Sequence, residues 1–181
     1  MRYSNAFKLI ANEFRRAGVP CMIVGGFAVN YHRVQRNTGD ADFLVADRDY
    51  EKVRTILESA GYQLTDKQDL VARFSHDEPF FIDVDIIFTD EKTLKEMIEA
   101  SAEASVRGEK VLVPSLDHLL AMKLHALKQG KERREPKDLG DVLDLMEKNG
   151  MDVDSDRFRA LCMKYANEEV YEKIRRALKS S

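Results

Sequence analysis

The stretch "VGGFAVNYHRVQRNTGDADFLV", residues 24–45, decides the fold. Its two adjacent glycines interrupt the short apolar segment "CMIV" that leads into it, and the spacer after them is typical of a short helix. Residues 36–45 then carry polar side chains at alternate positions before the apolar "FLV". Because successive side chains of a strand point to opposite faces, this spacing predicts a strand with Asp40 and Asp42 side by side on one face.

Two carboxylates on one face repel each other unless a cation, a basic neighbour or protonation relieves the repulsion. Carboxylate oxygens are the ligands that Mg²⁺ prefers, so a metal site is the favoured interpretation, with a solvated sheet edge as the alternative. Gly25 and Gly26 would let the backbone approach a phosphate closely, although glycines alone also fit a tight turn. Arg36 and Thr38 are either ordinary strand residues or site residues, with the arginine pairing to carboxylate or phosphate.

A second segment, "FFIDVDIIF" at residues 80–88, places Asp83 and Asp85 at alternate positions of an otherwise apolar strand. Burying such carboxylates unpaired would be costly. If this strand lies beside the first, one of its acids completes a three-carboxylate site of the kind that holds two metal ions in phosphoryl-transfer enzymes. We favour Asp85, with Asp83 as the alternative.

The rest of the chain predicts a mixed-sheet α/β domain over residues 1–113 and a helical C-terminal subdomain, packed on it, over residues 114–181. Amphipathic spacing and helix-ending glycines predict helices in both parts. They are expected at residues 3–17, 48–60, 90–100, 115–129, 136–149, 153–166 and 168–179. Further strands are expected in "YQLT" and "LVARFS", and "ASVRGEKVLVP" is expected to form a hairpin that turns at Gly108.

The composition narrows the function classes. The net charge of −3 over 181 residues gives no overall basic field for nucleic acid. The run "KQGKERREPK" at residues 128–137 is either an interhelical loop or a contact for an acidic substrate such as RNA. Cys21 and Cys162 lie far apart without CxxC spacing, so neither a disulfide framework nor a zinc site is indicated. No apolar run approaches the roughly 20 residues of a membrane helix, and a cytoplasmic protein without membrane contact is expected.

The glycine pair followed by the acids resembles the signature of the DNA polymerase β-like nucleotidyltransferase superfamily. In that signature an apolar strand, Gly-Gly or Gly-Ser and a spacer of about a dozen residues precede Asp-x-Asp or Asp-x-Glu. Here Gly25 and Gly26 match the glycines, Asp40 and Asp42 match the acidic pair, and Asp85 matches the third carboxylate. The Arg-x-Thr before the acids is similar to the small prokaryotic branch that includes the AbiEii-type toxins.

The later stretch at residues 113–146 resembles the same branch, whose members carry a lysine in one helix and Lys-Asp near the start of the next. Lys123 matches the first lysine, and Lys137 with Asp138 matches the second motif. The resemblance implies nucleotide-binding roles for Lys123 and Asp138. From spacing alone, Lys123 borders the apolar stripe of its helix, so it either extends to water or meets an anion. Asp138 is alternatively an N-terminal helix residue favoured by the helix dipole.

The resemblance implies a nucleotidyltransferase-type mixed sheet and transfer of a nucleoside monophosphate from a nucleoside triphosphate, such as ATP, to an acceptor hydroxyl. It also implies Mg²⁺ or Mn²⁺ as cofactor and pyrophosphate as product. The acceptor is tRNA or another RNA, a protein or a small molecule, as in aminoglycoside-modifying enzymes. A toxin-antitoxin system would add an antitoxin partner. The remaining alternative is a catalytically inactive nucleotide-binding or regulatory module of the same fold.

Overall fold

The computed structural model describes residues 3–130 and 135–179. The chain forms two compact units, which we call the sheet unit (Met1–Ala28 with Arg36–Pro114) and the helical unit (Val29–Gln35 with Ser115–Ser181). Helix α2, Gly25–Tyr31, passes from the first to the second. The expected division between residues 113 and 114 stays a prediction about domains. The helical unit begins at Ser115 but also takes in residues 29–35.

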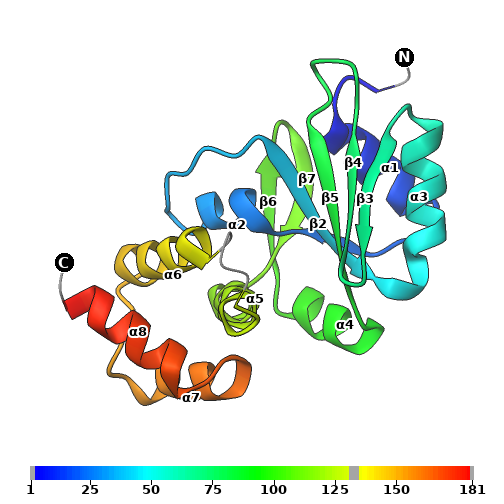
Figure 1. The fold of residues 1–181 in the computed structure, drawn as a ribbon. Helices are drawn as coiled ribbons and strands as arrows, with labels where there is room; N and C mark the ends of the chain where they lie inside the picture. Colours follow the sequence, from blue (N-terminus) through cyan, green and yellow to red (C-terminus); the bar gives the residue numbers. More distant parts are fainter. Residues whose placement is uncertain (1–2, 131–134, 180–181) are drawn as a thin grey trace. The chain divides into compact units, whose positions relative to one another are not determined.

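The sheet unit combines a five-stranded mixed sheet, a two-stranded hairpin and helices (Figure 1). Its elements besides α2 are α1 (Ala6–Arg16), β1 (Cys21–Ile23), β2 (Asp40–Ala46), the 3₁₀ helix η1 (Asp47–Asp49), α3 (Tyr50–Ser59), β3 (Gln63–Gln68), β4 (Val71–Ser75), β5 (Asp83–Thr89), α4 (Glu91–Glu99), β6 (Ala102–Val106) and β7 (Glu109–Val113). The sheet order is β1-β2-β5-β4-β3, in which β2 and β5 are parallel and every other neighbouring pair is antiparallel. The expected α/β class with a mixed sheet is confirmed.

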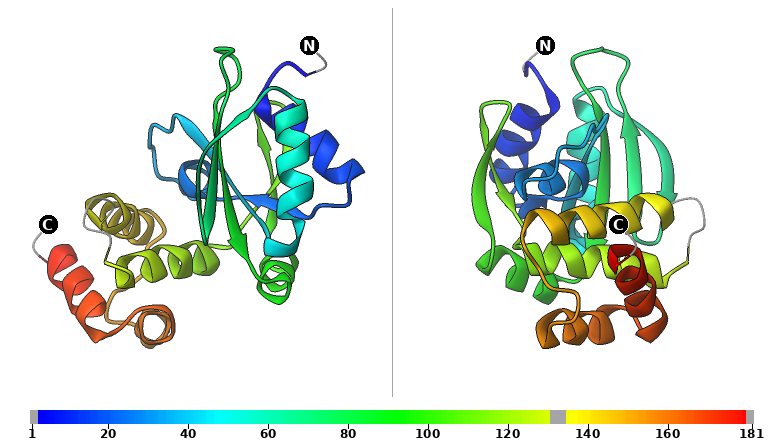
Figure 2. Two further views of the ribbon diagram at one scale, coloured as in Figure 1. Left: turned by 45° about the vertical axis from the view of Figure 1, so that its right-hand side comes forward. Right: turned by 90° about the vertical axis from the view of Figure 1, so that its left-hand side faces the viewer.

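Apolar side chains from helix and sheet form the core of the sheet unit. Helices α1 and α3 contact each other and lie on one side of the sheet (Figure 2). Phe7 of α1 is 1% exposed, and its ring centre lies 6.2 Å from that of Phe43 in β2. Asn5 caps α1 by accepting a hydrogen bond from the backbone N–H of Lys8. The core therefore fixes β2, the strand that carries the first two acids, against a capped helix.

Besides the end of α2, four helices lie within the described residues of the helical unit and pack against one another. They are α5 (Leu116–Lys128), α6 (Glu135–Lys148), α7 (Asp156–Tyr165) and α8 (Glu168–Lys179), and each end lies within three residues of the expected position. Among the described residues, no helix is both long and apolar enough to cross a membrane. Ser115 and Ser155 cap α5 and α7 through hydroxyls that accept backbone N–H groups. The apolar periodicity of the sequence thus located these helices well, and the caps are seen only in the structure.

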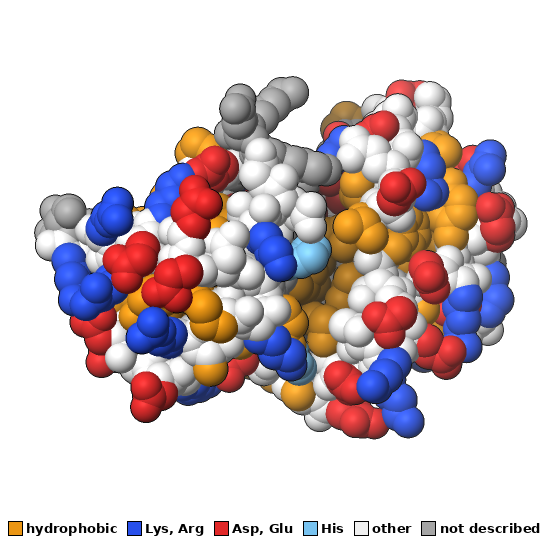
Figure 3. Space-filling model, turned by 60° about the horizontal axis from the view of Figure 1, so that its bottom comes forward, with side chains coloured by type: hydrophobic (Ala, Val, Ile, Leu, Met, Phe, Trp, Pro, Cys, Tyr) orange, Lys and Arg blue, Asp and Glu red, His pale blue; other side chains and the backbone are white. Residues whose placement is uncertain are grey.

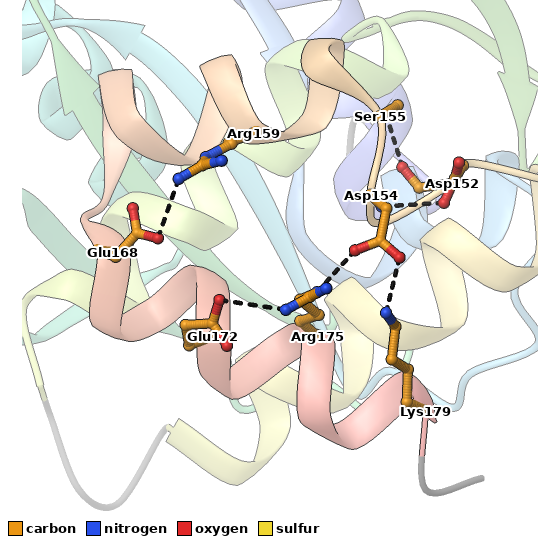
Figure 4. A network of polar contacts seen from close by, with 8 residues as sticks. All are labelled: Asp152, Asp154, Ser155, Arg159, Glu168, Glu172, Arg175 and Lys179. Atoms are coloured by element: carbon orange, nitrogen blue, oxygen red, sulfur yellow. Dashed lines mark hydrogen bonds and ion pairs between the residues drawn. The ribbon is translucent and has the colours of Figure 1, made fainter.

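Ion pairs connect α8 to the loop that precedes α7 (Figure 4). The Asp154 carboxylate accepts hydrogen bonds from Lys179 Nζ and Arg175 Nε, each at 2.7 Å. Arg159 of α7 also lies 3.3 Å from Glu168 at the start of α8. The side-chain hydrogen bonds from Lys179 and then Arg175 hold the pKa of Asp154 below its usual value. These contacts fix the C-terminal helix through surface charges as well as through its apolar face.

The expected strand over residues 36–45 is wrong in its first part, because β2 begins at Asp40. The Thr38 hydroxyl donates to the Asp40 backbone carbonyl and to Asp40 Oδ1, both at 3.0 Å. Local side-chain hydrogen bonds of this kind compete with the hydrogen bonds of a strand ladder. Residues 36–39 accordingly form a loop that leads into β2. The alternating polar pattern before Asp40 therefore does not describe one face of a sheet.

The second acidic strand also starts later than expected, at Asp83 and not within residues 80–82. The Phe81 N–H donates to the Glu78 carbonyl at 3.0 Å, and the Phe81 ring stacks on His76 with centres 4.5 Å apart. Phe81 is thus held by a turn and an aromatic stack before the strand begins. The strand predicted from the sequence was too long because the apolar residues 80–82 continue the apolar pattern although they lie outside the sheet.

Candidate active site

The parallel pairing of β2 and β5 brings the predicted acids together. Asp40 lies opposite Asp83, and Asp42 lies opposite Asp85, in neighbouring strands. One carboxylate oxygen from each of Asp40, Asp42 and Asp85 can be chosen so that all three atoms lie within 4.8 Å of one another. Asp83 is exposed and does not belong to this group. In geometry, therefore, Asp85 and not Asp83 is the third carboxylate.

This carboxylate group has the donor chemistry of a divalent-cation site. Asp42 is 7% exposed and Asp85 9% exposed, so water screens their charges only weakly. At an effective dielectric constant of about 20, two unit charges about 5 Å apart repel by about 3 kcal/mol. Three hard oxygen donors in a partly buried cluster match the preference of Mg²⁺ or Mn²⁺. The residues present thus fit such a cation, and its identity stays a prediction.

The glycine pair shapes the space next to the acids. Gly25 has φ +58°, and a Cβ placed there would lie 1.8 Å from Asp42 Oδ2. A Cβ on Gly26 would lie 2.6 Å from Thr38 Oγ1. Only glycine combines the positive φ of residue 25 with room for a carboxylate beside it. The two glycines therefore let Asp42 and Thr38 pack against the start of α2, and their contact with a phosphate stays a prediction.

Arg36 and Thr38 lie just before β2 and not within it. Thr38 fixes Asp40, because its hydroxyl donates to Asp40 Oδ1 as well as to the Asp40 carbonyl. Arg36 is half-buried. The structure thus gives Thr38 an orienting contact with one acid of the cluster, while the nucleotide-binding roles of both residues stay predictions.

The family of the chain follows from a comparison with protein-family models. A model described as an uncharacterised nucleotidyltransferase matches residues 1–179. The chain belongs to this nucleotidyltransferase family. The expected resemblance to DNA polymerase β-like nucleotidyltransferases and the expected enzyme class are thereby confirmed. The narrower likeness to AbiEii-type toxins stays a prediction.

Solved structures show the same fold. The antibiotic-resistance factor ANT(2'')-Ia is 16% identical, with 95% of this chain and 88% of that chain covered and a TM-score of 0.55. An antigenic nucleotidyltransferase-like protein from Paracoccidioides brasiliensis is 16% identical, with 94% and 89% covered and a TM-score of 0.56. The lincomycin-bound lincosamide antibiotic adenylyltransferase LnuA is 17% identical, with 81% and 99% covered and a TM-score of 0.54. Comparison with curated proteins gave no significant match.

In the helical unit of this nucleotidyltransferase, Lys123 meets two carboxylates of its own chain. Lys123 Nζ lies 2.7 Å from Asp138 Oδ1 and 2.6 Å from Asp141 Oδ2, and the three residues are 8%, 4% and 5% exposed. Of the two readings of Lys123 from its helix, contact with an anion is the one observed. Sequence reasoning missed Asp141, although its spacing of three from Asp138 places both on one face of α6. The nucleotide-binding roles of Lys123 and Asp138 stay predictions.

Sequence reasoning also missed Arg73 of β4, which contacts the third carboxylate. Arg73 Nε lies 3.3 Å from Asp85 Oδ2, and Arg73 Nη1 lies 2.6 Å from Asp66 Oδ2. In the sequence, Arg73 is only a basic residue in a partly apolar strand. Its place beside Asp85 follows from the order of the strands in the sheet. The nucleotidyltransferase therefore has the positively charged guanidinium group of Arg73 beside its acid cluster.

The two cysteines of the nucleotidyltransferase are free, and their ionisation is suppressed. Burial raises the pKa of the Cys21 thiol to about 12. Burial, assisted by the charge of Glu168, raises the pKa of the Cys162 thiol to about 12 as well. Because the thiolate is the reactive form, neither side chain is suited to nucleophilic or metal chemistry near neutral pH.

Acidic and basic side chains are interspersed on the face drawn in Figure 3. This pattern agrees with the small net charge of −3. Of the basic run at residues 128–137, residues 131–134 lie outside the described part of the chain. A contact of this run with RNA therefore stays a prediction.

Proposed function

We propose that this nucleotidyltransferase transfers a nucleoside monophosphate from a nucleoside triphosphate to an acceptor hydroxyl, with Mg²⁺ or Mn²⁺ as cofactor. The observation that carries the proposal is the group of three carboxylates, with ligand atoms within 4.8 Å, on neighbouring strands. The glycine turn whose geometry admits Asp42 supports it, as does membership of the nucleotidyltransferase family.

Asp40, Asp42 and Asp85 would hold the divalent cation, which supplies charge neutralisation for the triphosphate and the transition state. Asp85 would take up the proton of the acceptor hydroxyl. The hydroxyl oxygen forms a bond to the α-phosphorus while the bond from that phosphorus to the oxygen bridging to the β-phosphorus breaks. Pyrophosphate leaves with the electrons of that bond. Since the chain forms no covalent intermediate, its contribution is positioning and electrostatic stabilisation.

The residues around the acids would position the nucleotide. Thr38 holds Asp40 through its hydroxyl. The backbone at Gly25 and Gly26 would approach the phosphates, since neither residue has a side chain to keep them away. The half-buried Arg36 would pair with a phosphate oxygen. Each of these contacts is a proposal that rests on position next to the carboxylates.

The acceptor class is the second part of the proposal. ANT(2'')-Ia is known in complex with adenylyl-2''-tobramycin, and LnuA is a lincosamide adenylyltransferase, so a small-molecule hydroxyl is one candidate acceptor. tRNA or another RNA, a protein, and a toxin role with an antitoxin partner are the others. An inactive nucleotide-binding module is the alternative, and the presence of all three carboxylates argues against it.

The test is pyrophosphate release from each α-labelled nucleoside triphosphate, with and without Mg²⁺ or Mn²⁺. Acceptors are total RNA, a protein extract and a set of aminoglycosides and lincosamides. We expect metal-dependent release by the wild type, no release by Asp42→Asn, and wild-type release by Asp83→Asn, the matched acid outside the cluster. The destination of the label identifies the acceptor, and slowed growth on expression would support the toxin role. Nucleotide binding without release in every combination would overturn the proposal and leave a binding module.

A further inference from the structure

A row of charged residues crosses four strands of the sheet at one level. Asp42 in β2 lies opposite Asp85 in β5, Asp85 lies opposite Arg73 in β4, and Arg73 lies opposite Asp66 in β3. Directly opposite residues on neighbouring strands share a face, so these side chains form a line of two acids, one base and one acid. The line begins in the carboxylate cluster and ends outside it.

An irregularity in β3 places Asp66 in this row. Leu64 pairs with Phe74 and Asp66 pairs with Arg73, so Thr65 is an extra residue without a pairing partner. In a regular strand Asp66 would share the face of Leu64, and Thr65 would lie opposite Arg73. The Thr65 hydroxyl donates to the Arg73 carbonyl at 3.1 Å, which fixes the bulge against β4. The bulge thus presents a carboxylate to Arg73 where a regular strand would present a threonine.

Arg73 bridges the two acids with different nitrogens. Its Nη1 lies 2.6 Å from Asp66 Oδ2 and its Nε lies 3.3 Å from Asp85 Oδ2. The Arg73 side chain is 37% exposed, whereas the Asp85 side chain is 13% exposed. A planar guanidinium held at one end by Asp66 restrains the rotation of the Asp85 carboxylate at the other end, which a flexible ammonium would not do.

We propose that Arg73 is a positioning residue that holds Asp85 in its ligating orientation, with Asp66 as the anchor that holds Arg73. The inference rests on the proposed function, because Asp85 is assigned there as a metal ligand and proton acceptor. Outer contacts of this kind orient metal ligands, and their loss typically costs roughly 10-fold to 100-fold in metal affinity or activity.

Removal of Arg73 separates orientation from simple charge neutralisation. If Arg73 only offset negative charge, its loss would make the cluster more negative and tighten the binding of a cation. If Arg73 orients Asp85, its loss weakens cation binding although the site becomes more negative. The sign of the change in cation affinity therefore distinguishes the two roles.

The experiment measures Mn²⁺ binding without nucleotide, from the electron paramagnetic resonance signal of free Mn²⁺, together with kcat and KM for pyrophosphate release. For Arg73→Met we expect Mn²⁺ affinity and kcat to fall by roughly 10-fold to 100-fold, with little change in KM for the nucleotide. Arg73→Lys should recover only part of the loss, since lysine restores charge without the planar fork.

One further variant keeps the test valid if Arg73→Met does not fold, and another serves as the matched control. Asp66→Asn removes the charge of the anchor, whose side chain is 39% exposed, but keeps an oxygen that can accept from Arg73, so it should change both quantities in the same direction by a smaller factor. Arg54→Met removes an exposed arginine paired with Glu58 on α3 and should change neither.

The outcomes separate this inference from the proposed function. Tighter or unchanged Mn²⁺ binding in Arg73→Met, with wild-type kcat, would overturn the positioning role. The proposed transferase activity would still stand, because the wild type is active in that case. A wild type that binds Mn²⁺ but releases no pyrophosphate would overturn the transferase, and the change in Mn²⁺ affinity would still test Arg73. Absence of both binding and release in the wild type would overturn both.

Discussion

Gly25 faces Asp42 so closely that a Cβ on residue 25 would stand 1.8 Å from Asp42 Oδ2. The glycine that ends the first strand segment and the acid of the next strand are therefore one structural feature. A side chain at residue 25 would displace a member of the carboxylate cluster as well as strain the backbone. This relationship explains, in physical terms, why a glycine precedes the acids.

Gly25→Ala should abolish nucleotidyl transfer and lower the free energy of unfolding. The left-handed backbone conformation alone costs a non-glycine residue about 1–2 kcal/mol, and the contact with Asp42 adds to that cost. Gly18→Ala is the matched control, since Gly18 has φ +65° but no atom within 4 Å of the added Cβ. Urea unfolding and pyrophosphate release should show two destabilised proteins, of which Gly18→Ala alone is active. Full activity in Gly25→Ala would contradict the close approach.

Asp40→Asn should inactivate the enzyme and raise its thermal stability when no metal is present. The substitution removes one of three mutually repelling charges and keeps an oxygen that can accept the Thr38 hydrogen bond. We expect a gain of about 1 kcal/mol in the metal-free protein and a loss of at least about 1,000-fold in kcat. Asp83→Asn, outside the cluster, should leave kcat at the wild-type value. Calorimetry in chelator checks the first expectation, and a lower melting temperature for Asp40→Asn would contradict it.

The sequence predicted those parts of the fold that depend on local periodicity. The helices from Leu116 onward and the hairpin β6–β7 follow from apolar spacing and glycine turns. Strand starts were less predictable. The polar and apolar patterns of the two acidic strands continue into residues 36–39 and 80–82, which are not strands. There Thr38 donates a hydrogen bond to Asp40, and Phe81 stacks on His76.

The candidate site was predictable only where its residues lie close in sequence. Asp40 and Asp42 share a short motif, whereas the choice between Asp83 and Asp85 depends on their depth beside β2, which the sequence does not contain. The contact of Arg73 with Asp85 depends on the strand order, and its contact with Asp66 depends also on a one-residue bulge in β3. These parts of the site arise from register, because a shift of one residue would turn every side chain to the other face.

Lys123→Met should strongly destabilise the protein. Lys123 is 8% exposed and contacts Asp138 and Asp141, so its removal takes an ammonium group away from two buried carboxylates. Breaking a buried ion pair in this way typically costs about 3–5 kcal/mol. Lys128→Met, at an exposed position of the same helix, is the control and should cost little. Urea unfolding measures both, and equal stability of the two variants would show that the buried contacts contribute nothing.

The nucleotide-binding role predicted for Lys123 can be tested separately from its structural role. The triple variant Lys123→Met/Asp138→Asn/Asp141→Asn removes the ammonium together with both carboxylates, and should recover most of the stability lost in Lys123→Met. If the ammonium binds the triphosphate, this folded variant should bind labelled nucleotide more weakly in equilibrium dialysis. Unchanged affinity would restrict Lys123 to the structural role.

The contacts of Asp154 with Lys179 and Arg175 should make the attachment of α8 sensitive to acid and to salt. Their hydrogen bonds lower the pKa of Asp154 in the folded protein, so the unfolded chain takes up a proton at higher pH than the folded chain does. The stabilisation is therefore complete above the unfolded pKa of about 3.9 and is lost as pH falls through the lower folded value. Because the group is exposed, salt should weaken the effect.

Comparison of Asp154→Asn with wild type tests this pH dependence. Asp154→Asn should have a lower melting temperature than wild type by a constant amount between about pH 5 and pH 8, and the difference should shrink below about pH 4. It should also shrink in about 1 M salt. Asp144→Asn, at an exposed position of α6, provides the matched loss of one negative charge. A difference that grew on acidification would contradict the assigned sign, since it would mean that folding raises the pKa of Asp154.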